Sequence, residues 1–245
     1  MKFGFYTIII GLFLVGCAKV NHVATITPTQ YKIGEIASND SIAALIEPYK
    51  KQLDAQMNQV IGTCAKDLIK ARPESTLGNW MSDALMVAAK KYTSTSIDIS
   101  LVNYGGIRIP SLSKGDITKG KIFELMPFDN VMVIVELDGA TLQVFFDHMA
   151  AKKGWPISEG IQYEIVDGKA RNVTIQNKKI DINQTYRVLL SDYIANGGDR
   201  CNFLIDRPKE NLGVFIRDAL IGYVQDVTKR GELIDSNLEK RVVNK

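Results

Sequence analysis

The chain has 245 residues, of which 46% are hydrophobic and 23% are charged, with 30 basic and 27 acidic side chains and a formal net charge of +3. This is the composition of a globular protein long enough for one large domain or two small ones. Because its basic residues form no tail or stripe, the sequence argues against binding of a nucleic acid polymer.

The N-terminal segment MKFGFYTIIIGLFLVGCAKV carries one lysine and a continuous apolar run. The run is too short for a membrane-spanning helix and is typical of a secretory signal. Its ending, LVGC, resembles a bacterial lipobox and predicts a signal peptide at residues 1–16 with lipidation of Cys17. The alternative is an ordinary signal with an incidental cysteine. With several acyl chains, residues 17–39 would be a stable tether to the bacterial cell envelope, on its periplasmic side.

Helical periodicity begins after the tether, where Asp40 can cap a helix that stops at Gly62. Its apolar positions follow i, i+3, i+4, i+7 spacing and are Ile42, Leu45, Ile46, Tyr49, Leu53, Met57 and Val60. A short strand can follow at 63–69. A second helix is expected after the polar turn at 72–76, with an inward stripe of Leu77, Trp80, Met81, Ala84, Leu85 and Ala88. A strand at 97–103 then leads into a glycine-bearing loop.

The second half alternates strands and helices. A short helix ends before Pro127, and the apolar run at 130–137 predicts a strand buried on both faces. Further helices are expected after Asp138 and within 211–228, and the short strands lie at 161–166, 171–176 and 185–191. This order predicts an α+β fold of mixed α/β layers, with mixed sheets packed against helices, as one domain with a single core at 40–232 and a frayed, charged tail at 233–245.

Several kinds of chemistry lack their usual residues. The chain has only two histidines, His22 and His148, and no motif that pairs them with cysteine or carboxylate in metal-ligand spacing. A packed or surface role is therefore expected for His148. No Gly-x-Ser-x-Gly elbow, Walker loop or dinucleotide fingerprint occurs. Cys64 and Cys201 could pair in an oxidising compartment or remain two buried thiols, and their spacing leaves both interpretations open.

Three loops that follow strands or a short helix carry polar and aromatic side chains. They are NYGGIR at 103–108, LMPFDN at 125–130 and DYIANGGDR at 192–200. Taken singly, each is more often a turn or a core phenylalanine than a site. Together they offer two aromatic rings that can sandwich a flat heterocycle, with stacking of about 1–3 kcal/mol per base. An aspartate can accept hydrogen bonds from ribose hydroxyls, an asparagine can pair with a base edge, and an arginine can bind phosphate.

These motifs, with STLGNWMSDAL at 75–85 and VELDGATL at 135–142, resemble in order and spacing the C-terminal domain of the 5′-nucleotidase family over roughly residues 40–228. The family removes phosphate from nucleotides, and its C-terminal domain binds the nucleoside. The resemblance implies that the substrate-binding residues are Asn103, Gly105, Gly106, Arg108, Phe128, Tyr193, Asn196 and Asp199, with Arg72 as the nearest match to a further family arginine.

Three departures from the family pattern affect this interpretation. Tyr104 replaces a glycine of the usual triplet, and Arg200 follows Asp199 where a glycine is common. The family's metallophosphoesterase domain, which carries two metals and the catalytic histidine, has no counterpart in residues 18–40. The resemblance therefore implies no catalytic or metal-ligating residue and no cofactor in this chain, with divalent metals expected only in a partner.

Three functions are compatible with these features. The first is the nucleotide- or nucleoside-binding half of a split 5′-nucleotidase, inactive alone and completed by a separately encoded metallophosphoesterase. The second is a non-catalytic envelope lipoprotein that binds nucleosides. The third is a scaffold with a decayed pocket, against which Arg108, Phe128, Tyr193 and Asp199 argue, because drift should have eroded a set so scattered along the chain.

Overall fold

The structure, a computed structural model, describes residues 28–29 and 39–245, so the predicted signal peptide, the Cys17 lipidation site and most of the predicted tether lie outside the described residues. The chain divides into two units, Met1–Leu45 and Ile46–Lys245, and the fold is that of the second. Among the described residues, no helix is both long enough and apolar enough to cross a membrane.

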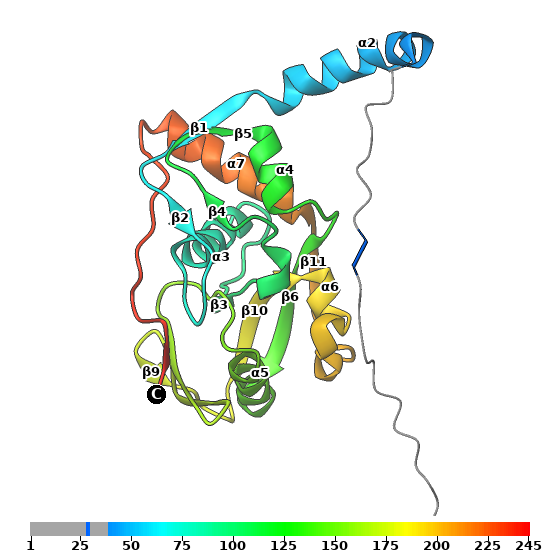
Figure 1. Cartoon of the computed structure of the whole chain (residues 1–245). Coiled ribbons are helices and arrows are strands. Elements are labelled where there is room, and N and C mark those ends of the chain that lie inside the picture. The colour runs from blue at the N-terminus through cyan, green and yellow to red at the C-terminus, as the bar shows by residue number, and fades with distance from the viewer. Residues whose placement is uncertain (1–27, 30–38) are drawn as a thin grey trace, which may run out of the picture. The chain divides into compact units, whose positions relative to one another are not determined.

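Helices and strands alternate along the second unit, which begins within helix α2 (Figure 1). The helices are α2 (Asp40–Met57), α3 (Thr76–Ala89), α4 (Lys119–Leu125), α5 (Gly139–Ala151), α6 (Asp192–Ala195) and α7 (Ile216–Lys229), with short 3₁₀ turns η1 (Tyr104–Gly106), η2 (Gly198–Arg200) and η3 (Asn202–Leu204). The strands are β1 (Val60–Cys64), β2 (Leu68–Ile69), β3 (Ile99–Ser100), β4 (Ser111–Leu112), β5 (Gly115–Thr118), β6 (Val131–Asp138), β7 (Ile161–Val166), β8 (Lys169–Ile175), β9 (Lys178–Lys179), β10 (Thr185–Ser191), β11 (Lys209–Phe215) and β12 (Val242–Asn244).

Strand β6 lies inside a four-stranded sheet of order β11-β6-β10-β3. It is antiparallel to both of its neighbours, whereas β3 is parallel to β10. Successive side chains of a strand point to opposite faces. Met132 and Ile134 accordingly join one hydrophobic cluster, while Val133 and Val135 join another. The strand is buried on both faces, as its continuous apolar run predicted.

The two clusters are covered by different elements. The first contains Leu77 of α3, Ile122 of α4 and Leu220 of α7. The second contains Phe145 of α5 and Tyr163 of β7, which belongs to a separate four-stranded sheet of order β12-β7-β8-β9. In Figure 1, α4 and α7 lie toward one end of the second unit and α5 toward the other. The expectation of a single core is therefore wrong, since a sheet buried on both faces has apolar packing on each side.

The mixed α+β class is confirmed, and the predicted second helix, the helix after Asp138 and the strands at 161–166 and 185–191 form close to the expected bounds. The first helix differs from its prediction. Its first turn is capped by the Asn39 side chain, which accepts a hydrogen bond from the backbone of Ser41, and none of its residues is buried. It ends at Met57, and Gly62 lies within β1, where an added Cβ would come within 2.5 Å of Val224. Gly62 thus permits close packing against α7 rather than stopping a helix.

The C-terminal segment also differs from expectation. Residues 211–215, predicted as the start of the last helix, belong instead to β11 at the edge of the central sheet. The expectation of a frayed tail at 233–245 is wrong, because Ile234 is buried and β12 pairs in parallel with β7. Arg241 is only 2% exposed, and its two terminal nitrogens donate to Asp83 of α3 at 2.7 and 2.9 Å.

The two cysteines of the described chain are free and buried. Cys64 belongs to the first hydrophobic cluster and Cys201 to the second, so the central sheet separates them. Burial raises the pKa of both thiols, that of Cys201 to about 12. The structure therefore favours two buried thiols over the disulfide that the sequence left open.

The Arg241–Asp83 pair should contribute strongly to stability. We expect Asp83→Ala to lower the free energy of unfolding by about 2–3 kcal/mol, because it leaves a buried guanidinium with the more exposed Glu239 as its remaining carboxylate and the carbonyl of Ile157 as its other hydrogen-bond acceptor. Urea denaturation measures the change, and Asp206→Ala, at an exposed turn position, is the control. Equal stability of the two variants would show that the pair does not hold the C-terminal segment.

Candidate functional site

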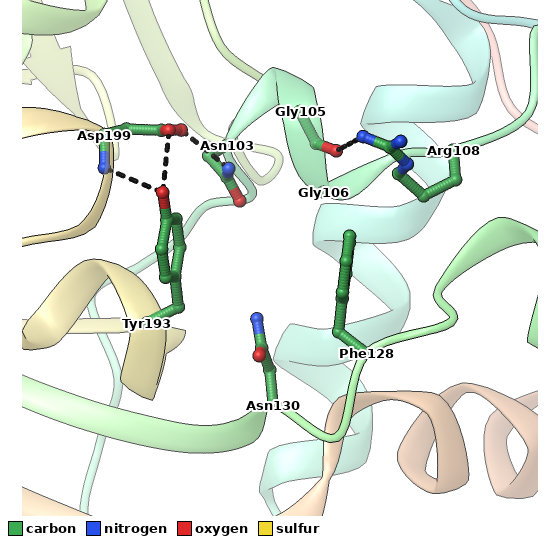
Figure 2. A pocket seen from close by; sticks show the side chains of 8 residues that line it. All are labelled: Asn103, Gly105, Gly106, Arg108, Phe128, Asn130, Tyr193 and Asp199. Carbon is green, nitrogen blue, oxygen red and sulfur yellow. Dashed lines mark hydrogen bonds between the residues drawn. The ribbon is translucent and has the colours of Figure 1, made fainter.

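The three loops singled out in the sequence meet at one pocket of about 320 Å³ (Figure 2). The residues that line it are Asn103, Gly105, Gly106, Arg108, Phe128, Asn130, Tyr193 and Asp199. All of these except Asn130 were predicted from the sequence. Asn130 was missed although it stands two residues after Phe128 in the same motif, because the motif assigned no role to it.

The glycine-bearing loop leaves β3 and enters η1 at Tyr104. Asn103, just before that turn, is 7% exposed, and its side-chain nitrogen donates to the Asp199 carboxylate at 2.7 Å. At the other end of the loop, the backbone N–H of Arg108 donates to the carbonyl of Leu125 in α4 at 2.9 Å. The Arg108 guanidinium extends toward the ring of Phe128, 5.6 Å from its centroid. The loop is thus fixed at both ends while its arginine stays exposed.

The Phe128 loop joins α4 to β6, and a side chain of α7 holds it in place. Arg217 donates to the Asp129 carboxylate at 2.9 Å, and its guanidinium lies 4.2 Å from the centroid of Phe123. The Arg217 side chain is 11% exposed, so this ion pair is largely sheltered from water on one side. Phe128 itself remains 38% exposed.

The third loop begins where β10 ends. Ser191 caps the short helix α6 by accepting a hydrogen bond from the backbone of Ile194. The carboxylate of Asp192 accepts one from the backbone of Val131 at 3.1 Å, which ties α6 to the start of β6. Tyr193, on α6, is 47% exposed. The loop that carries Tyr193 is therefore attached directly to the strand that follows the Phe128 loop.

Tyr193 and Asp199 are joined by two hydrogen bonds across the glycine turn. The Tyr193 hydroxyl donates to the Asp199 carboxylate and accepts from the Asp199 backbone N–H, each at 3.2 Å. Asp199 has a positive φ of 51°. An added Cβ on Gly198 would lie 2.5 Å from the carbonyl oxygen of Tyr193 and 2.6 Å from its ring. A glycine at 198 therefore lets the turn fold back onto the aromatic ring.

The rings of Phe128 and Tyr193 face each other across an open gap, with Asn130 at its floor (Figure 2). The Asp199 carboxylate and the Asn103 amide lie at the Tyr193 side of this gap, and Arg108 lies at the Phe128 side. Two exposed aromatic faces favour stacking of a flat ring between them. A carboxylate and an amide beside them supply directional hydrogen bonds.

Two predicted residues do not line the pocket. Asn196 is exposed and ends α6, with its backbone N–H bonded to the carbonyl of Asp192. Arg72 is exposed, and its guanidinium lies 3.9 Å from the centroid of the Tyr104 ring. Arg200 is exposed and is also outside the lining.

His148 lies against Trp155 and Phe203, so it is a packed histidine, as the sequence analysis expected. Burial is the main cause of its lowered pKa.

Residues 60–206 match the family model of the 5′-nucleotidase C-terminal domain. The chain belongs to the 5′-nucleotidase family. UshA of Yersinia enterocolitica is 31% identical to it over 78% of the chain and 35% of the relative. A cell wall protein of Listeria monocytogenes, Lmo0130, is 28% identical over 88% of the chain and 30% of the relative. The chain thus spans about a third of the length of these relatives.

A solved structure shows the same architecture. The 5′-nucleotidase precursor from Thermus thermophilus has a TM-score of 0.71 and 26% identity, over 85% of the chain and 44% of the precursor. The mixed sheets packed against helices are therefore those of a 5′-nucleotidase C-terminal domain, as the resemblance implied.

The close approach at Gly198 gives a direct test of how the site is held. We expect Gly198→Ala to lower the free energy of unfolding by about 1–3 kcal/mol, because the new methyl group overlaps Tyr193 and one of the two must move. Gly222→Ala in α7 is the control, because its Cβ meets no atom within 4 Å, and it should be neutral or slightly stabilising. Urea denaturation measures the free energy of unfolding of both variants. A Gly198→Ala protein as stable as the parent would contradict the close contact between Gly198 and Tyr193.

Proposed function

We propose that the chain is the nucleotide- or nucleoside-binding half of a 5′-nucleotidase-type phosphohydrolase, completed by a separately encoded metallophosphoesterase. The observation that carries the proposal is the pair of exposed rings, Phe128 and Tyr193, on opposite sides of a pocket that also holds a carboxylate and an amide. Membership of the 5′-nucleotidase family supports a nucleotide as the ligand.

In this proposal the base stacks between Phe128 and Tyr193. Asp199 accepts hydrogen bonds from the ribose hydroxyls, since its carboxylate is already oriented by Asn103 and Tyr193 and keeps further acceptor capacity. Asn130, at the floor of the gap, is placed to bond a base edge. Because these groups are set before the ligand arrives, little conformational freedom is lost on binding.

Phosphate removal in the family uses metal-activated water. The described residues contain no group of three or more His, Cys, Asp or Glu side chains that could hold a metal ion, so they do not fit the family's metals. The proposal therefore assigns the metals and the attacking group to the partner chain. The residues of this chain bind and orient the substrate.

A second candidate is a non-catalytic lipoprotein that captures nucleosides at the cell envelope. The name of the relative Lmo0130, a cell wall protein, and the predicted lipidation of Cys17 support a location at the envelope for either function. The two candidates use the same pocket and differ only in whether a catalytic partner exists. A gene for a stand-alone metallophosphoesterase beside this one would favour the split enzyme.

The stacking assignment predicts the effect of removing either ring. Phe128→Ala and Tyr193→Ala should each weaken adenosine binding by about tenfold or more, given that base stacking contributes about 1–3 kcal/mol. Isothermal titration calorimetry measures the affinity, with Tyr92→Ala as a control at another exposed aromatic residue. If both ring variants keep the parent affinity, the pocket is not the nucleoside site.

The split-enzyme assignment predicts that the purified chain does not hydrolyse AMP. We expect no phosphate release above the buffer rate when Mg²⁺, Mn²⁺, Co²⁺ or Zn²⁺ is added, and release once the product of an adjacent metallophosphoesterase gene is mixed in. Hydrolysis by the chain alone would overturn the split-enzyme proposal. No release from the mixture would favour the non-catalytic alternative.

A further inference from the structure

Asp192 is bonded to both segments that carry the aromatic rings of the pocket. One oxygen of its carboxylate, Oδ1, accepts the backbone N–H of Tyr193 at 2.9 Å and the backbone N–H of Val131 at 3.1 Å. Tyr193 carries one ring, and Val131 begins β6 three residues after Phe128, which carries the other. A single oxygen atom therefore joins the segments on the two sides of the gap in Figure 2.

The bond to Val131 lies where the pairing of β6 with β10 ends. Ser191 and Met132 are the last paired residues at this end, and the chain then turns into α6. Beyond this pair, the side chain of Asp192 accepts the N–H of Val131 in place of a backbone carbonyl. An unpaired N–H at a half-buried residue would cost free energy, so this bond favours a fixed position of α6 beside β6.

The segment that carries Phe128 is also attached to the start of α7. The backbone N–H of Ile216, the first residue of α7, donates to the carbonyl of Asn130 at 2.9 Å. The ion pair between α7 and Asp129 lies one residue earlier. The Phe128 loop is thus held by α7 and by Asp192, and it cannot move toward α6 without breaking at least one of these bonds.

The rings of Phe128 and Tyr193 need such attachments to stay apart. Two apolar rings that face each other in water gain free energy by closing onto each other, because contact removes apolar surface from water. Both rings nevertheless remain exposed, with a gap between them. Asp192 supplies a direct bond between the two segments. A flat ligand can then stack on both rings without first separating them, which lowers the cost of binding.

We propose that Asp192 is a positioning residue of the pocket, which sets the separation of Phe128 and Tyr193 for one flat base stacked between them. The inference rests on the proposed function, because it assigns the gap to the base of a nucleoside. Asp192 does not line the pocket, so it acts through the two rings and touches no atom of the ligand.

Isothermal titration calorimetry with adenosine tests the positioning role. Asp192→Ala should weaken binding by about tenfold, as the loss of one stacking face would, because the two ring-bearing segments are no longer joined. Asp192→Asn should keep the affinity within about threefold of the parent, since its amide oxygen can accept the same two hydrogen bonds. Asp181→Ala removes another carboxylate that accepts a backbone N–H, at an exposed turn, and is the matched control with parent affinity. A loss in Asp192→Asn as large as that in Asp192→Ala would overturn the proposal.

A double-mutant cycle separates positioning of the rings from a general loss of structure. Since Asp192 acts through the rings, Asp192→Ala combined with Phe128→Ala should bind adenosine little more weakly than Phe128→Ala alone. Losses that multiply would show an effect independent of the rings and would overturn the proposal. Parent affinity in Asp192→Ala, beside weakened Phe128→Ala and Tyr193→Ala, would overturn it while the proposed function stands. Parent affinity in both ring variants would overturn the proposed function and this inference with it.

Urea denaturation shows whether each variant is folded in the calorimetry buffer. If Asp192→Ala is unfolded there, Asp192→Glu replaces it in the test. This variant keeps a carboxylate, but the added methylene group moves its oxygens away from the two N–H groups. It should weaken adenosine binding several-fold, and parent affinity in Asp192→Glu would overturn the positioning role.

Discussion

The pocket depends on the register of the strands on either side of β10. Antiparallel pairing sets Ser191, the last residue of β10, opposite Met132 at the start of β6. Parallel pairing of β3 with β10 makes the chain leave β3 at the same end of the sheet. The loop before β6, the loop after β10 and the loop after β3 therefore meet at one edge. A shift of one residue in this register would exchange the side chains that β6 presents to the two hydrophobic clusters, so specific packing on both faces fixes the site along with the sheet.

The side chains of the pocket are held by neighbours that do not line it. Asp192 joins the Tyr193 helix to β6, and Arg217 holds Asp129 beside Phe128. These contacts let two large rings remain exposed without collapsing onto each other. The same arrangement leaves Asp199 with a fixed orientation, because its carboxylate accepts from both Asn103 and Tyr193. Rigid elements that support the loops from behind are what a binding site for a flat ligand requires.

Electrostatics divides the pocket into two regions. A carboxylate and amides lie beside Tyr193, whereas three cations without carboxylate partners in the described chain gather beyond the glycine turn. A ligand with a neutral, hydrogen-bonding part and an anionic part matches both regions. The Tyr104 ring lies beside two of these cations, Lys70 and Arg72.

Local patterns allowed much of the fold and of the site to be predicted. Elements could be predicted where the signal spans only a few residues, as in the apolar run of β6, the amphipathic spacing of α3 and α5 and the turn residues around 196–199. Four motifs in order indicated the family. They also identified seven of the eight lining residues, which are Asn103, Gly105, Gly106, Arg108, Phe128, Tyr193 and Asp199. Periodicity failed where the same apolar residues suit two structures. Residues 209–215 become an edge strand because β6 offers unpaired backbone groups, which no local pattern reports.

The sequence by itself determined the family, the central strand and the residue types available to the pocket, because these follow from short-range patterns. Only the tertiary structure decided which side chains meet. The C-terminal segment packs because Asp83, far away in the chain, neutralises Arg241. The Arg72 guanidinium lies over the Tyr104 ring and does not line the pocket. The residues in these contacts lie far apart in the sequence, and no local pattern indicates that they will meet. The contacts form only after the sheets and helices have brought the residues within a few ångströms of each other.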